Sequence, residues 1–371
     1  MISYLGYSIF LGGFVYPVVV HTIWSTNGYL SSGQTNPLLG IGVLDFAGSG
    51  VVHITGGAAA LCASCIVGPR TGRFYDAKGA PLARLGLRKG QSVALQMLGT
   101  MILWFGWYGF NPGSALLLGL PNSAEIAAHA AVTTTLAAAT GAIVALVTKG
   151  FYLQRTSGEF SLEVTAAMNG CLSGLVAITG SCAIVTEGCA IVIGVLAAWI
   201  YLSSSALLIQ IKIDDAVDAI PVHLSNGIWG LFSVGLFADP SLVAGVFNIE
   251  GRPAGWFYNL GKPHLLCSQL VGTVFIVSWT CMMMIPFFKC MEYFKLLRVS
   301  LIDEIVGLDA DYNGSETPQK LFDDRGSESD EELRLKAYRM NFEGKRDKKK
   351  VSIDELMNAS WGDFGDLTQH S

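Results

Sequence analysis

Apolar residues occur in long runs that alternate with short polar segments through most of this chain. A helix that crosses a membrane needs about 20 mostly apolar residues, and runs of that length recur up to residue 290. The pattern predicts an all-α, polytopic membrane bundle of about eight transmembrane helices. The expected spans are residues 2–24, 45–68, 91–115, 123–148, 161–184, 188–210, 216–238 and 264–290.

The charged residues divide the chain into two regions. The whole sequence is 51% hydrophobic and 14% charged, whereas a soluble domain carries about 25% charged residues. Residues 1–290 hold 23 charges and residues 291–371 hold 30. So few charges cannot cover a water-facing surface. We therefore expect a transmembrane domain at 1–298 and a charged, cytoplasmic C-terminal tail at 299–371.

The net charge argues against a nucleic-acid partner. It is −5, and the acidic excess lies in the tail, so the chain lacks the basic face that binds nucleic acid. The expected surroundings are a lipid bilayer.

Basic residues in the short loops predict the orientation. Lysine and arginine concentrate in cytoplasmic loops, and loop 69–90 carries six of them while loop 25–44 carries none. With eight spans, both termini are then cytoplasmic. The six residues are Arg70, Arg73, Lys78, Arg84, Arg88 and Lys89.

Asp45, His53 and His223 are ionisable residues in apolar runs. Their presence needs an explanation, because placing polar groups in a membrane costs free energy. Asp45 opens the second run. It can cap a helix start or attract a cation, and the two roles are compatible. His53 and His223 lie at similar depth in separate runs. Each could join helices by a hydrogen bond, or together they could form a neutral pair that contacts a small amine or carries a proton.

Aromatic residues suggest a second polar site. Trp24 can belong to an interfacial belt. Trp104, Trp107 and Phe110 share one helix face, which usually means packing, but Ser114 follows them at the outer end. An aromatic face beside a hydroxyl suits a small cation.

The remaining cysteines and histidines give weaker evidence for a functional site. Cys62 and Cys65 form a CxxC pair inside an apolar run without further ligands nearby, which favours buried thiols over a metal site. His129 is interpreted as a packing residue. We find no nucleophile with a base, so we expect no enzyme and no cofactor.

Three segments carry a family resemblance. DFAGSGVVH at 45–53, WFGWYGFNPGS at 104–114 and VH at 222–223 together resemble the ammonium transporter family, which includes the methylammonium permeases and is related to Rhesus proteins. The likeness is strongest to its plant and algal branch. It extends through GPRTGRF at 68–74 to the tail segment GLD at 307–309.

The resemblance implies a role for each matching residue. Trp24 and Ser114 would recruit ammonium at the outer face, and Asp45 would support that site from behind. His53 and His223 would be paired histidines in a hydrophobic pore that passes ammonia. The residues assigned to the recruiting site and the pore are Trp24, Asp45, His53, Trp107, Phe110, Ser114 and His223.

The resemblance also implies an oligomeric state, and it shows a difference in the number of spans between this chain and the family. Family members are trimers with one pore per subunit, so a homotrimer, or a heterotrimer with paralogues, is expected in the plasma membrane. The family has eleven spans, and the first run here resembles the fourth of them. We therefore expect the first three to be absent from this chain.

That difference leaves two functions open. The chain either transports ammonium or is a truncated, non-transporting regulatory subunit or ammonium sensor that modulates full-length paralogues. A transporter for an anionic solute would need paired broken helices, and the sequence shows no such pair.

Overall fold

The computed structural model describes residues 2–75, 80–82, 92–116, 122–248 and 253–299, together with Glu304. The expected tail at 299–371, apart from Val299 and Glu304, therefore lies outside the described residues, as do Lys78, Arg84, Arg88 and Lys89 of the basic loop and the GLD segment.

The described residues form helices, as the hydrophobic pattern predicts, with two isolated β-bridges. Each of the eight expected spans contains a helical stretch. They are α1–η1–α2 (Ile2–Phe10, Leu11–Val15, Tyr16–Trp24), η3–α3 (Ser49–Ile54, Thr55–Val67), α4 (Val93–Phe110), α5 (Ser123–Ser157), α6 (Val164–Thr179), α7 (Glu187–Gln210), η5–α8 (Ile220–Ser225, Asn226–Phe237) and α10 (His264–Tyr293).

Among the described residues, seven of these stretches are long and apolar enough to cross a membrane. The eighth, α6, has 16 residues instead of the expected 161–184. The chain leaves the helix after Thr179, and residues 180–185 remain buried in turns. Short elements that the pattern did not predict are η2 (Leu38–Gly40), η4 (Pro112–Ala115), α9 (Pro240–Phe247) and η6 (Trp256–Tyr258).

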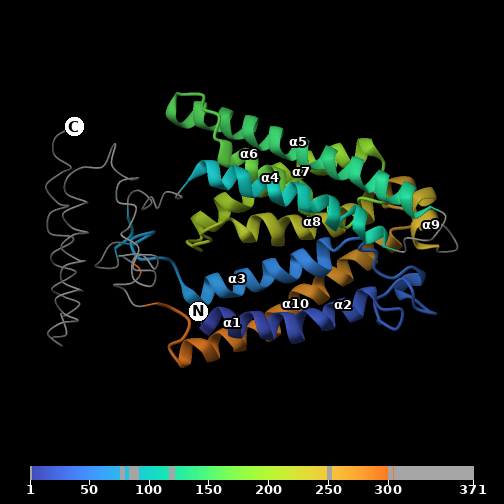
Figure 1. Ribbon diagram of the computed structural model, residues 1–371, viewed down its shortest axis with the longest axis horizontal. Coiled ribbons are helices and arrows are strands. Elements are labelled where there is room, and N and C mark those ends of the chain that lie inside the picture. The colour runs from blue at the N-terminus through green and yellow to red at the C-terminus, as the bar shows by residue number, and fades with distance from the viewer. Residues whose placement is uncertain are drawn as a thin grey trace, which may run out of the picture. The chain divides into compact units, whose positions relative to one another are not determined.

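The helices of the bundle lie side by side with their long axes roughly aligned (Figure 1). Small residues bring α5 and α6 together: a side chain added at Gly174 would meet the backbone of Ala137, and one added at Gly170 would meet Gly141. Backbones can approach this closely only where side chains are small. The backbones of α5 and α6 are therefore in close contact along these small residues.

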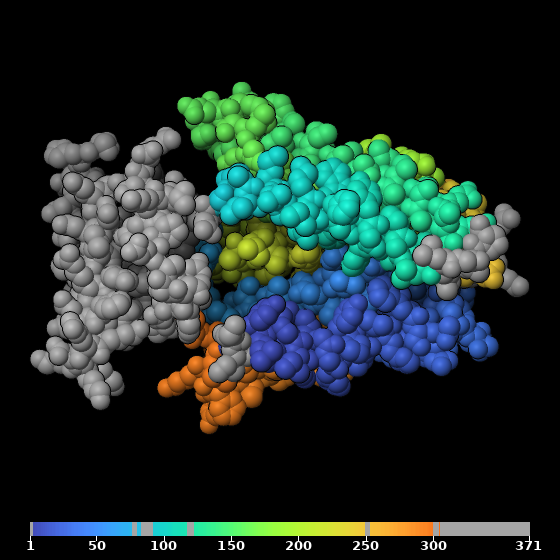
Figure 2. All heavy atoms as spheres, in the orientation of Figure 1, coloured from blue at the N-terminus to red at the C-terminus, as the bar shows by residue number. Residues whose placement is uncertain are grey.

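On one face of the bundle, a groove runs between α4 and the α1–α2 helix (Figure 2). Phe14 and Trp24 of that helix are about half exposed. Large exposed apolar side chains are ordinary for a helix that faces lipid or another apolar helix.

Residues 69–89 and 295–371 form a second compact unit. Within it, the Glu304 carboxylate accepts a hydrogen bond from the Thr71 backbone N–H at 2.7 Å and pairs with Arg298 at 2.9 Å. Partial burial would raise the pKa of Glu304, but these two donors lower it below its ordinary value. These contacts of Glu304 connect the segment after α10, through Arg298, with the loop after α3, through Thr71.

Candidate functional site

The two histidines lie on π-helical segments. His53 belongs to η3 and His223 to η5, and each segment continues directly into an α-helix. A π-turn widens the helix and often marks a functional site. Pro221 lies in the first turn of η5, where its missing N–H would have no intrahelical partner. The sequence pattern predicted helices here but not this wider geometry.

Asp45 explains where η3 begins. Its carboxylate accepts hydrogen bonds from the backbone N–H groups of Gly48 (3.1 Å), Gly50 (2.9 Å) and Val51 (2.8 Å). Gly48 has a φ of +109°, which an L-residue rarely adopts. Asp45 therefore precedes the helix. The helical part of the expected span at 45–68 begins at Ser49, and the carboxylate four residues earlier caps the backbone N–H groups at its start.

The histidine rings meet in the interior. The Nδ1 atoms of His53 and His223 lie 3.2 Å apart, and the rings stack with centroids 5.2 Å apart and planes 13° apart. One Nδ1 must donate its hydrogen to the other. Two protonated rings would each point an N–H at the other, so this contact requires at least one neutral ring.

Close backbone approach makes the contact possible. A side chain at Gly57, one turn after His53, would overlap the backbone nitrogen of Leu224 and come within 2.6 Å of its Cα. Leu224 is the neighbour of His223. The glycine thus lets α3 touch η5 at the level where the rings meet.

Two aromatic residues of α4 complete the ring cluster. Trp107 stacks on His53 with centroids 5.4 Å apart and planes 9° apart, and Phe110 lies 5.8 Å from His53. These two rings flank His53, whereas His223 on its other side is half-buried. The His53 side chain is 6% exposed, and its Nε2 atom has no hydrogen-bond partner among the described residues.

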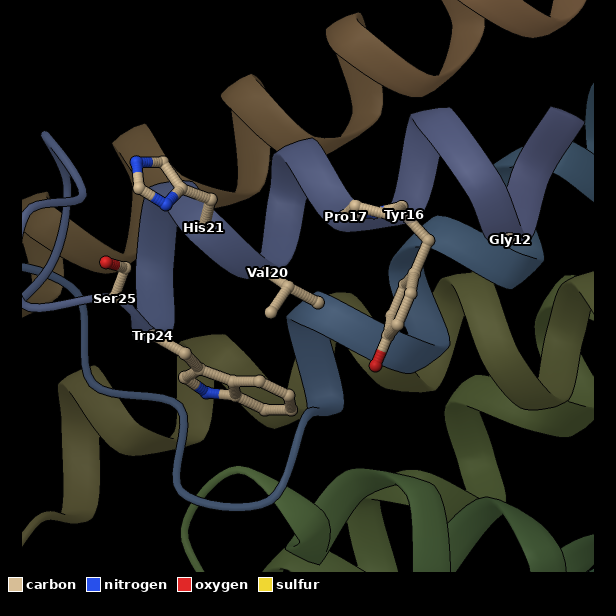
Figure 3. Close-up of a pocket in the computed structure, with 7 residues that line it drawn as sticks. All are labelled: Gly12, Tyr16, Pro17, Val20, His21, Trp24 and Ser25. Carbon is tan, nitrogen blue, oxygen red and sulfur yellow. The ribbon is translucent and has the colours of Figure 1, made fainter.

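Trp24 is joined to Asp45 at the other end of η3. Its indole N–H donates to the Asp45 backbone carbonyl at 2.6 Å, and its ring packs over Gly48. Trp24 also lines an open pocket of about 510 Å³ along η1 and α2. Figure 3 shows the rings of Trp24 and Tyr16 on the same side of the helix, with His21 turned to the other side.

Ser114 lies in η4, directly after the helix of Trp107 and Phe110. Its hydroxyl donates to the Phe110 carbonyl at 2.8 Å. Because the proton is used in this bond, the oxygen is left to accept. The site residues predicted from the sequence thus form three groups. His53, His223, Trp107 and Phe110 form a ring cluster, Trp24 and Asp45 form a second pair, and Ser114 follows the helix of Trp107 and Phe110.

The acidic residues before η5 have different partners. The Asp215 carboxylate accepts a hydrogen bond from the Ile220 N–H at 2.6 Å, at the start of η5. Asp218 instead accepts from Asn169 (3.1 Å), Tyr201 (3.1 Å) and Ser205 (2.9 Å). No sequence pattern indicates this cluster, because its members lie on α6, on α7 and in the loop before η5.

The remaining candidates lie apart from the rings. His129 bonds the Val185 carbonyl at 2.8 Å and lies 3.6 Å from Glu187. Cys62 is buried, and Cys65 is exposed. Within the described ranges, no group of three or more histidine, cysteine or acidic side chains could hold a metal ion.

Replacing Asp45 with asparagine tests the cap. The amide can replace only one carboxylate oxygen, and each buried N–H left unpaired costs about 1–3 kcal/mol. We expect D45N to lower the thermal unfolding midpoint of the purified protein by several degrees relative to wild type in the same detergent. An unchanged midpoint would mean that the carboxylate acts only through its charge.

Comparisons with known proteins identify relatives of this chain. The profile of the Ammonium Transporter Family matches residues 1–317. Ammonium transporter 1 member 2 of Oryza sativa subsp. japonica is 41% identical over 323 residues, covering 84% of this chain and 63% of the relative. Its namesake in Arabidopsis thaliana is also 41% identical, with 84% of this chain and 60% of the relative covered. The chain thus spans about six tenths of the length of these relatives.

Solved structures show the same fold. The crystal structure of Candida albicans Mep2 matches with a TM-score of 0.66 at 29% identity, covering 85% of this chain and 66% of Mep2. A protein named Sensor Amt Protein matches with a TM-score of 0.64 at 33% identity, covering 81% of this chain and 67% of its own.

Proposed function

Because the chain belongs to the ammonium transporter family, we propose that it moves ammonium across a membrane, recruiting the cation at the outer face and passing ammonia along the His53–His223 pair. The observation that carries this proposal is the 3.2 Å contact between the two Nδ1 atoms, with the rings of Trp107 and Phe110 against His53. Such a pair offers hydrogen bonds without a permanent charge.

The outer recruiting site consists of Trp24 and Ser114, with Asp45 behind it. The indole face of Trp24 attracts a cation. Ser114 supports this role because its oxygen is left to accept a hydrogen bond, which is what ammonium, a donor only, requires. Asp45 fixes Trp24 through its carbonyl and the start of η3 through its carboxylate.

A comparison of free-energy costs favours deprotonation of ammonium before it passes through the pore. Placing a bare ion in a dry, low-dielectric pore has an idealised cost of tens of kcal/mol. Removing a proton from ammonium at neutral pH costs about 3–4 kcal/mol if its pKa lies about 2–3 units above 7. The neutral species therefore has the lower barrier, and potassium has no proton to lose.

The Nε2 atom of His53 is the contact point for ammonia. If His53 donates its Nδ1 hydrogen to His223, its Nε2 carries a lone pair that accepts from ammonia; in the other tautomer its Nε2–H donates. Ammonia can do both, so either tautomer serves.

The proposed setting follows the loop charges. Residues 1–298 form the membrane domain and residues 299–371 the cytoplasmic tail, with both termini inside. The assembly is a homotrimer, or a heterotrimer with paralogues, in the plasma membrane. Cross-linking in native membranes and protease access to tagged termini test these features.

Ion competition tests the transport proposal. Liposomes that contain the protein should take up labelled ammonium at a rate that a large excess of potassium leaves unchanged, because the pore passes the neutral molecule. Empty liposomes and liposomes with a His53→Ala variant are the controls. Potassium currents as large as the ammonium flux would contradict the proposal.

A sensor or regulatory subunit is the second candidate, and the match to a solved protein named Sensor Amt Protein favours it. Expression in yeast that lacks ammonium uptake separates the two. Growth on low ammonium supports transport. Absence of growth, with altered uptake when a full-length paralogue is present, supports the regulatory role.

A further inference from the structure

Thr179, the last residue of α6, touches both the segment that leads into η3 and the ring that stacks on His53. Its carbonyl accepts a hydrogen bond from the Ala47 N–H at 3.1 Å. Its hydroxyl oxygen accepts from the Trp107 indole N–H at 3.0 Å. The side chain is fully buried. One residue therefore connects α6 to Trp107 and to the segment that precedes η3, which carries His53.

The direction of these bonds is fixed. The Thr179 hydroxyl donates its own hydrogen to the Leu175 carbonyl at 2.7 Å. It can therefore act toward Trp107 only as an acceptor. The indole is an N–H donor without an acceptor, so the two groups match in polarity as well as in position.

The bond also orients the indole ring. An indole has two side-chain torsions, and its N–H lies in the ring plane. Stacking on His53 sets the plane, with 9° between the rings, and the bond to Thr179 sets the rotation within that plane. Trp107 thus presents only its π-face to His53.

Without this acceptor, the indole N–H would be an unsatisfied donor in a buried cluster. Unpartnered donors of this kind are costly and acquire a partner where they can. The Nε2 of His53, in the same cluster, has no hydrogen-bond partner among the described residues. A rotated indole N–H would compete with ammonia where Nε2 carries the lone pair, and a water molecule bound to the indole could compete in either tautomer.

From these contacts we infer that Thr179 is a positioning residue: it binds the Trp107 N–H and so keeps the His53 Nε2 free for ammonia. This inference rests on the proposed function for the role of Nε2, while the position of the indole is independent of it.

Two substitutions at this position form a matched set. Thr179→Val has nearly the same shape without the hydroxyl, and Thr179→Ser keeps the hydroxyl without the methyl group. We expect T179V to lower ammonium uptake by about tenfold, the effect of one buried hydrogen bond. T179S should remain within about twofold of wild type, because it preserves the same bond. Amounts of protein in the membrane are matched by fluorescence of a C-terminal fusion.

A double-mutant cycle identifies the route of the effect. Trp107→Phe removes the indole N–H, so adding T179V to W107F should cost little further uptake if Thr179 acts through that group. A tenfold loss from T179V in the W107F background would overturn the inference. So would equal losses in T179V and T179S, which would indicate a packing role.

A spectroscopic measurement separates this inference from the proposed function. The resonance Raman band of the indole N–H reports its hydrogen bonding, and subtracting the W107F spectrum isolates Trp107. T179V should shift that band and T179S should not, in purified full chain whether or not it transports. An unshifted band overturns the positioning role. Absence of wild-type uptake with a shifted band instead overturns the transport proposal.

Discussion

Replacing His53 with alanine is expected to reduce ammonium uptake to the level of liposomes without protein. The substitution removes the Nε2 contact inside the ring cluster and leaves the Nδ1 of His223 without its partner. A polar molecule that crosses an apolar region without a hydrogen bond meets a cost of roughly 2 kcal/mol or more. That cost slows passage by at least about 30-fold. Initial rates of labelled ammonium uptake measure the effect.

Two variants separate the loss of the contact from misfolding. Asparagine at position 53 can still bond His223 through its amide, but it has no group where Nε2 stood. We expect H53N to purify as wild type does and yet to lack uptake. His21→Ala, which changes an exposed histidine on the far side of α2 (Figure 3), should leave uptake unchanged. Undiminished uptake by H53N would contradict the role given to the ring pair.

A single methyl group at Gly57 is expected to abolish uptake as well. In Gly57→Ala, the new Cβ would overlap the Leu224 backbone, which cannot rotate away as a side chain can. The helices must separate, and the Nδ1 contact between His53 and His223 lengthens beyond hydrogen-bond range. Overpacking of this kind costs about 1–3 kcal/mol. We expect background uptake and a lower thermal unfolding midpoint.

The neighbouring glycine provides a matched control. A Cβ at Gly56 would meet nothing within 4 Å. Alanine favours a helix over glycine by about 1 kcal/mol at both positions, so Gly56→Ala should be neutral or slightly stabilising with normal uptake. If G57A and G56A behave alike, close approach at Gly57 does not hold the rings together.

Part of this site could be predicted from local sequence alone. The length and spacing of the apolar runs predicted the helices, because the membrane sets a minimum length for a span. The cost of a polar group in an apolar run singled out Asp45, His53 and His223. The motif at 104–114 indicated the aromatic face of α4. These inferences depend only on which residue types occur and on their positions along the chain.

The π-helical segments η3 and η5 could not be predicted from local sequence. A π-turn forms where neighbouring helices stabilise it, and nothing in SGVVHI or IPVHLS requires one. The early end of α6 at Thr179 is similar. The apolar run continues past it, but the chain turns there because its backbone bonds residues 46 and 47.

The sequence by itself therefore determined that this protein is a helical membrane bundle with two interior histidines and an acidic residue at a helix start. Only the tertiary structure decided that the two histidines face each other across 170 residues of chain, that Asp45 caps the helix of one of them, and that Thr179 holds the indole that stacks on it. The physical reason is that burial and hydrophobicity act on each segment separately, whereas hydrogen-bond partners and ring contacts depend on which segments the folded chain brings together.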